Sequence, residues 1–190
     1  MTKRLFGRMM SVFSALLLIS VIGCSSPVAS DFSADFVSKA GSMSSKGKMF
    51  FAKDKFRMET PQTITISRMD TKTVWILMPS QKMYMKQAMT EDNTKGVSQK
   101  MAGEIKREKV GTETINGIKA DKYKVTYNAG GKSNSILQWI SSRLSMPVKT
   151  SSVDGKWSME LRNIKFGPQS ESLFEIPKGY KEFSYNIPSF

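Results

Sequence analysis

Apolar and polar residues alternate with a period of two along most of this chain, and that alternation restricts it to a β-rich fold. Successive side chains of a strand point to opposite faces, so each alternating run predicts a strand with one apolar face. The run 73–78 (TVWILM) is apolar on both faces, which predicts a strand covered on both sides. The alternating runs of the first half are 31–40, 48–52, 55–60, 63–68 and 82–87.

Turn residues separate these runs at short intervals. Asn116-Gly117 is a strong two-residue hairpin signal because both residues accept positive φ, and Gly130-Gly131 and Asp154-Gly155 predict two further hairpins. Closely spaced strands joined by hairpins form an antiparallel meander. The strands expected in the second half are 108–115, 118–127, 134–141, 147–153 and 156–166.

Helical patterns are scarce. Val97, Met101 and Ile105 recur every four residues, which predicts a short amphipathic helix over 97–107. A second short helical turn is expected near Ser170–Phe174. The chain is therefore expected to be mainly β with short helices.

The N-terminal segment has the features of a lipoprotein signal. Three cations among the first eight residues precede an apolar run, 12–22, that is shorter than the ~20 residues of a membrane span. The segment Val21-Ile22-Gly23-Cys24 resembles the lipobox of bacterial lipoproteins, in which the cysteine becomes the acylated N-terminus. An ordinary signal peptide with an unrelated cysteine, or a signal anchor, is the alternative. We predict a signal peptide at 1–23, acylated Cys24 with a flexible tether to residue 30, and one domain at 31–190.

The residue counts exclude several kinds of chemistry. The chain has no histidine, so His-dependent triads and His-ligated metals are excluded, and its one cysteine lies in the lipobox. No phosphate-binding glycine loop is present, and the acidic residues lie in turns or on polar strand faces. We therefore expect no enzyme, no cofactor and no resident metal.

Charge and methionine content indicate the partners. The net charge is +13, and removal of Lys3, Arg4 and Arg8 with the signal leaves +10, which favours anionic partners. For an exported lipoprotein that partner is a membrane surface rather than nucleic acid. The alternative is a solvated basic surface with no partner. The 14 methionines suit a wall for apolar ligands of variable shape or simple core packing, and less well a Cu(I) site made of thioethers.

Several segments together resemble a known family. They are Lys48-Met-Phe-Phe-Ala-Lys-Asp-Lys-Phe-Arg-Met-Glu59, Ile64-Thr-Ile-Ser-Arg68, Val74-Trp-Ile-Leu-Met78, Lys82-Met-Tyr-Met85, Gly111-Thr-Glu-Thr-Ile-Asn-Gly117, Asp121-Lys-Tyr123, Trp139-Ile140, Met146-Pro-Val-Lys149 and Leu173-Phe-Glu-Ile-Pro-Lys-Gly-Tyr180. Over roughly residues 32–182 the chain resembles an uncharacterised group of outer-membrane lipoproteins that are similar in fold to the lipoprotein carrier LolA and its receptor LolB. The resemblance implies an open antiparallel half-barrel with short helices capping an apolar concave face.

This resemblance also implies a function. We expect a monomeric, non-enzymatic outer-membrane lipoprotein, anchored through Cys24 and facing the periplasm, that binds lipid or lipoprotein acyl chains on the concave face. The alternative is an envelope structural or sensing protein that uses the same fold to bind a protein partner. The residues predicted to line the lipid site are Met49, Phe51, Phe56, Met58, Ile64, Ile66, Met83, Met85, Tyr123, Val125, Trp139, Trp157, Met159 and Leu161.

Overall fold

The computed structural model describes residues 31–89, 101, 103–144 and 146–183, and these are almost entirely β-structure. Their strands follow the alternating runs closely, because each run offers one face for burial and one for solvent. The strands are β1 (Phe32–Ala40), β2 (Met43–Ala52), β3 (Lys55–Glu59), β4 (Ile64–Arg68), β5 (Thr73–Met78), β6 (Met83–Ala88), β7 (Glu104–Ile115), β8 (Ile118–Ala129), β9 (Lys132–Ile140), β10 (Lys149–Ser152), β11 (Trp157–Phe166) and β12 (Lys181–Glu182).

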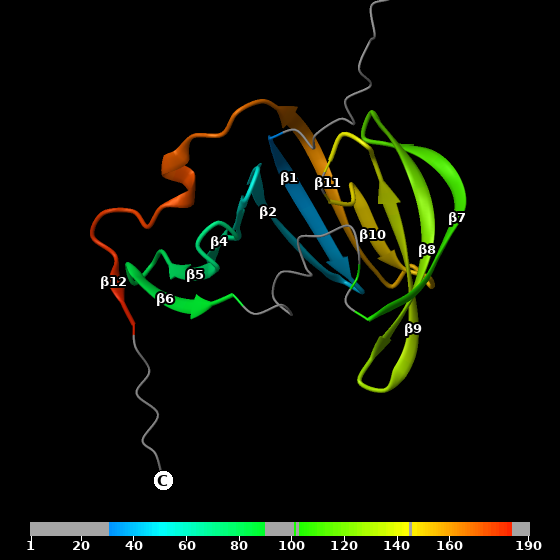
Figure 1. The fold of residues 1–190 in the computed structure, drawn as a ribbon, viewed down its shortest axis with the longest axis horizontal. Helices are drawn as coiled ribbons and strands as arrows, with labels where there is room; N and C mark the ends of the chain where they lie inside the picture. The colour runs from blue at the N-terminus through cyan, green and yellow to red at the C-terminus, as the bar shows by residue number, and fades with distance from the viewer. Residues whose placement is uncertain (1–30, 90–100, 102, 145, 184–190) are drawn as a thin grey trace, which may run out of the picture.

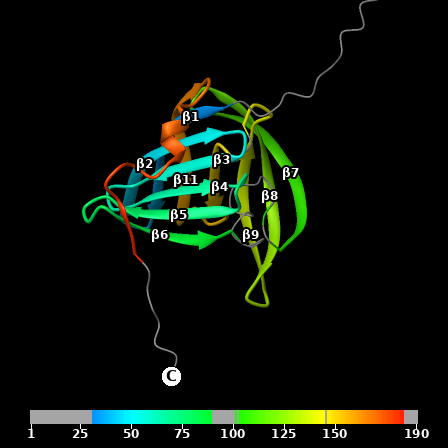
Figure 2. The ribbon, with the colours of Figure 1, turned by 60° about the vertical axis from the view of Figure 1, so that its left-hand side comes forward.

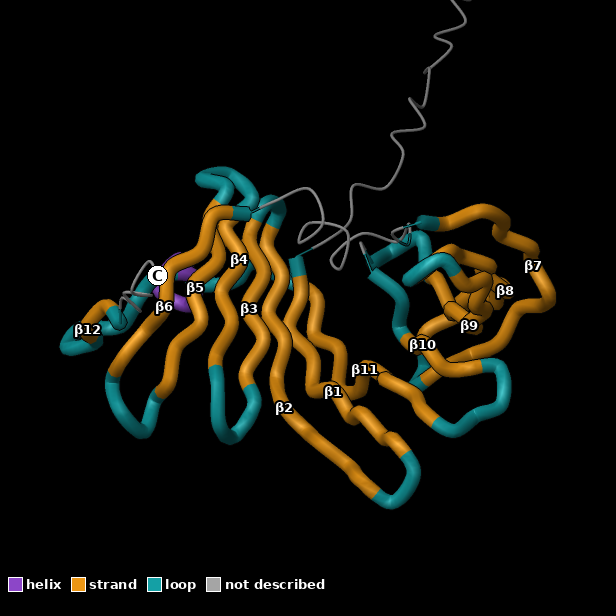
Figure 3. The backbone as a smooth tube through the Cα atoms, turned by 90° about the horizontal axis from the view of Figure 1, so that it is seen from below, coloured by secondary structure: helices purple, strands orange, loops and turns teal. Residues whose placement is uncertain are grey.

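These strands form one open, strongly arched sheet (Figure 1). Its order is β12-β6-β5-β4-β3-β2-β1-β11-β10-β9-β8-β7, so two antiparallel meanders meet where β1 pairs with β11. β12 is the one parallel addition, pairing with β6 at one edge, and β7 forms the other edge. The two halves curve toward each other without closing, which confirms the predicted open half-barrel (Figure 3).

The predicted hairpin turns have the backbone conformation that their residues favour. Asn116 and Gly117 both have positive φ, at 49° and 81°, as the two-residue turn between β7 and β8 requires. Gly130 and Gly131 behave in the same way between β8 and β9. The glycines therefore fix the length of each hairpin.

Substitution at the first of these turns gives a direct test of the fold. Gly117→Val should destabilise the protein by about 1–2 kcal/mol, because a β-branched residue is forced into the left-handed region. A Cβ at Gly117 meets no atom within 4 Å, so the loss comes from the backbone alone. Urea unfolding followed by circular dichroism measures it. Gly111→Val is the matched control, since Gly111 has open space and no positive φ, and equal losses in both variants would contradict this account of the turn.

The helix predictions require two corrections. Residues 104–107, at the end of the predicted helix 97–107, belong to β7, where Ile105 is largely exposed; residues 97–100 and 102 lie outside the described part of the chain. The expected turn near Ser170–Phe174 is confirmed as the 3-10 helix η2 (Glu171–Phe174). η2 contacts β3 and β4 on the outer face of the arch, away from β7–β9, so the helix in the described residues covers the convex face and not the concave one (Figure 2).

The core consists of two hydrophobic clusters. The larger is centred on β1, β2 and β11, where the rings of Phe32 and Phe51 stack 5.7 Å apart, and the β9–β10 connection packs against it. The smaller contains Ala52, Ile66, Leu77 and Phe174, beneath η2. The C-terminal segment is therefore an integral part of the fold. Within the described residues, no helix is long and apolar enough to span a bilayer.

Candidate functional site

The concave face is the candidate site, and the strand register defines which side chains belong to it. One cross-strand row runs over six strands through neighbours Ala34, Met49, Met58, Thr65, Ile76 and Met85. A parallel row contains Phe32, Phe51, Phe56, Ser67 and Val74. Cross-strand neighbours on one face are in side-chain contact distance, so these rows form a nearly continuous apolar surface.

The register brings eleven of the fourteen predicted lining residues onto this face. They are Met49, Phe51, Phe56, Met58, Met83, Met85, Tyr123, Val125, Trp157, Met159 and Leu161. Within β7–β11 the face continues through the row Tyr123, Gln138, Thr150 and Met159. Trp157 lies at the far end of β11 and is 38 % exposed, so it belongs to the rim of the arch.

Ile64 and Ile66 lie on the convex face instead. Ile66 pairs with Arg57 and Trp75, whose side chains point away from the methionine row. Phe174 of η2 covers Ile66 and is itself fully buried. These two isoleucines are therefore part of the smaller core cluster and are not placed to line the concave face.

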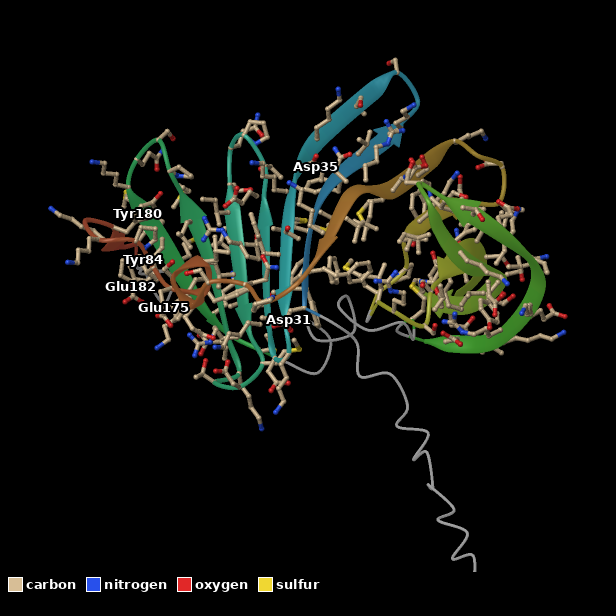
Figure 4. The ribbon with its side chains drawn as sticks, turned by 90° about the horizontal axis from the view of Figure 1, so that it is seen from above. Asp31, Asp35, Tyr84, Glu175, Tyr180 and Glu182 are labelled. Atoms are coloured by element: carbon tan, nitrogen blue, oxygen red, sulfur yellow. The ribbon has the colours of Figure 1, made fainter. Side chains whose placement is uncertain are left out.

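Cations and backbone carbonyls hold η2 in this position. Arg57 donates to the carbonyl oxygen of Leu173 at 2.8 Å, Arg68 donates to the carboxylate of Glu175 at 2.7 Å, and Lys55 pairs with Glu171. Hydrogen bonds from Arg68 lower the pKa of the Asp70 carboxyl. Farther along, the Tyr84 hydroxyl donates to Glu182 at 3.2 Å, which joins β6 to β12 beside Glu175 and Tyr180 (Figure 4).

Trp139 also lies on the convex face. Its ladder partner is Lys149, and the ammonium groups of Lys122 and Lys149 each lie 4.9 Å from its ring. Its indole N–H donates to Glu113 at 2.8 Å, and hydrogen bonds from Lys122 and then Trp139 lower the pKa of the Glu113 carboxyl. Trp139 is 4 % exposed and also belongs to the larger hydrophobic cluster, and in the ladder it alternates with Gln138, so it serves the packing of the fold rather than the wall that carries Gln138.

Among the concave methionines, burial decreases from β2 toward β6. Met49 is 2 % exposed and Phe51 5 %, as in an ordinary core. Met58, Met83 and Met85, farther out on β3 and β6, are only half-buried. The outer methionines are therefore accessible apolar side chains on a concave surface.

Comparison with known proteins places the chain in a family. Residues 35–146, more than half of the chain, match the model described as Domain of unknown function (DUF4412). The chain belongs to this DUF4412 family. No curated protein matches it significantly.

Solved structures share the fold of this DUF4412 protein at low identity. An uncharacterised conserved protein from Thermus thermophilus superposes with a TM-score of 0.57 at 12 % identity, covering 83 % of this chain and 91 % of the other. A structure of MucB gives 0.53 at 10 % identity over 80 % of this chain, and the Pseudomonas aeruginosa MucA/MucB complex gives 0.51 at 13 % identity over 76 %. The chain spans only 59 % and 55 % of those two, so the likeness shows the fold alone.

A group of methionines on the concave face bears on the alternative of Cu(I) binding. Met78 is the ladder partner of Met83, and Met85 follows two residues later on the same face. Three methionine side chains thus share one corner of this face, whereas Cu(I) coordination requires their sulfurs to converge on one point. The described residues contain no group of three or more acidic, His or Cys side chains that could hold another metal.

The convex side carries a polar groove of about 640 Å³ where β1 and β11 pair irregularly. Ser33, Lys48, Phe50 and Lys165 line it. Asn163, at the irregularity, has φ +50° and donates to Asp35 at 2.7 Å, so its amide is committed to the fold.

Some concave residues could not be identified from the sequence pattern. Val74, Ile76 and Met78 belong to β5, whose residues are apolar on both faces, so alternation could not assign them. Gln138 was missed because its polar side chain does not match an apolar wall, although it is 3 % exposed. Only its ladder position between Tyr123 and Thr150 reveals it.

Proposed function

We propose that this protein is an envelope lipoprotein whose concave face binds lipid acyl chains. The observation that carries the proposal is the methionine-rich row across six strands, buried at Met49 but only partly buried at Met58 and Met85. A closed core would bury these side chains fully, whereas an open surface of flexible thioethers adapts to chains of variable shape.

The predicted N-terminal features complete this proposal. Residues 1–23 act as a secretion signal, Cys24 carries the lipid anchor, and residues 24–30 connect the anchor to the domain at 31–190. Ser25, rather than Asp, follows the cysteine, which favours the outer membrane, and we propose that the monomeric domain faces the periplasm. All of residues 1–30 lie outside the described part of the chain.

A charge on the concave face tests the proposal. Met85→Glu should weaken binding of an apolar, environment-sensitive dye at least tenfold, because the carboxylate must lose water when the ligand enters. The urea midpoint should change little, because Met85 is only partly buried and water can reach the new carboxylate. The measurements are dye titration and urea unfolding of the full chain carrying Cys24→Ser, so that no attached acyl chain competes for the site.

Ala88→Glu is the matched control, since it adds the same charge on the same strand at an exposed position on the opposite face. It should bind the dye as the unmodified face does. If Met85→Glu lowers the urea midpoint strongly and dye affinity only slightly, the face is packed core. A starting protein that takes up no apolar dye would end the lipid hypothesis.

The second candidate is a protein-binding role. The MucA/MucB structure shows a domain of this fold in a complex with another protein, which supports this alternative at the level of the fold. The same dye titration separates the two, because a concave face specialised for a protein partner has no requirement to accept a small apolar ligand.

A further inference from the structure

Gln138 is a buried amide with an unmet hydrogen-bonding group. Gln138 is 3 % exposed, and within the described residues its side-chain oxygen accepts no hydrogen bond. Folded proteins rarely leave a buried acceptor unpaired, because the group has lost its water without gaining a partner. The amide oxygen therefore lacks a donor among the described residues.

The position of Gln138 indicates where that donor comes from. On the concave face its ladder neighbours are Tyr123 and Thr150, and Val125 and Ile136 lie one row away. The amide is thus a buried polar group in the β8–β10 part of this face, while the methionine rows occupy β2–β6. A ligand that covers the concave face would contact apolar side chains at one end and an unpaired hydrogen-bond acceptor at the other.

The charges nearby restrict the chemistry of such a ligand. Arg107 and Lys109 are the ladder partners of Val125 and Tyr123. Arg107 pairs with Glu104 at 2.7 Å and Lys109 with Asp121 at 2.8 Å, so both cations already have counter-ions. An ionised carboxylate or phosphate buried here would have to compete for them, whereas a neutral donor needs only the amide.

We propose that Gln138 accepts a hydrogen bond from an uncharged donor of the bound lipid, a hydroxyl or an amide N–H. The lipid then lies with this group over β8–β10 and its hydrocarbon along the methionine rows of β2–β6. This inference rests on the proposed lipid-binding function and adds the class and the orientation of the ligand.

Displacement of the apolar dye by two matched lipids tests the inference. The probes are 1-tetradecanol, which carries a hydroxyl donor, and tetradecyl methyl ether, which does not. The full chain carrying Cys24→Ser should bind the alcohol about tenfold more tightly than the ether, which is the scale of one buried hydrogen bond. With Gln138→Met the two affinities should become equal, and the affinity for the ether should stay unchanged. Gln62→Met, the same change at an exposed site in the turn between β3 and β4, should retain the preference.

Each other outcome contradicts a specific step. Equal affinities in the starting protein, or an undiminished preference in Gln138→Met, would overturn the assignment and leave an ordered water as the donor. Gln138→Met should also unfold at an equal or higher urea concentration, because it removes an unpaired polar atom from the interior. A large fall in that midpoint would show that the amide is already satisfied in the fold and would overturn the inference. Failure of both lipids to displace the dye, with the dye still bound, would restrict the face to other ligands and overturn the inference, whereas failure of the dye itself to bind would overturn the proposed function.

Discussion

Phe174→Ala is expected to lower the free energy of unfolding by about 3–5 kcal/mol, the range for a buried phenylalanine truncated to alanine. Phe174 has no exposed surface and covers Ala52, Ile66 and Leu77 on the convex face. Its loss leaves a cavity that the short η2 cannot close, because Arg57 and Arg68 hold the backbone of η2 on the sheet. Urea unfolding monitored by circular dichroism measures the change.

Phe183→Ala is the control for this substitution. Phe183 also lies in the C-terminal segment but is 38 % exposed, so its truncation should cost well under 1 kcal/mol. A loss below about 1 kcal/mol in Phe174→Ala would show that η2 is not part of the stabilising core. Dye binding should survive in Phe174→Ala at urea concentrations where the protein remains folded, because the cavity opens on the face opposite the methionine rows.

Cys24→Ser is expected to abolish lipid attachment completely, because the acylation reaction requires the cysteine thiol. The precursor should remain uncleaved before residue 24, and no radiolabelled palmitate should enter it. A single acyl chain gives only marginal membrane affinity, so stable membrane attachment of the original protein requires the several chains that this class of lipoprotein carries. Membrane fractionation and labelling in cells measure both effects.

Ser26→Ala serves as the control for the anchor, since it leaves the lipobox residues intact and should be labelled normally. Label in Cys24→Ser, or none in the original protein, would contradict the assignment of Cys24. Neither variant should change the urea midpoint, because both positions precede the sheet.

Most strands and turns could be predicted because they depend on local pattern. The run 73–78 became β5 with the same bounds, and Asn116-Gly117 formed its turn with both φ angles positive. The predicted helix over 97–107 was wrong from residue 104 onward: spacing by four fits alternate positions of a strand as well as one face of a helix, and Ile105 lies exposed on β7. β12 was missed because a strand of two residues is too short to show an alternation of apolar and polar side chains.

The site was predicted less completely, because membership of a face depends on register between strands distant in sequence. Eleven of the predicted residues share the concave face, but the alternation in β4 does not say which face of the sheet its isoleucines occupy. Phe174, more than 100 residues later, covers them from the convex side. Trp139 was misplaced for a similar reason, since its cations and carboxylate come from β7, β8 and β10.

The ladder between β1 and β11 sets the order in which the chain can fold. Every other antiparallel pair joins strands that follow each other in sequence, whereas this pair joins residues separated by about 120 positions, such as Phe36 and Leu161. Long-range pairing slows folding, because a large loop must close before its contacts are gained. A chain that emerges N-terminus first can form its β1–β6 meander early, but the free edge of β1 stays uncovered until β11 has emerged. During that interval the exposed edge is a site for mispairing, so protection by a chaperone is most valuable before β11 is available to pair with β1.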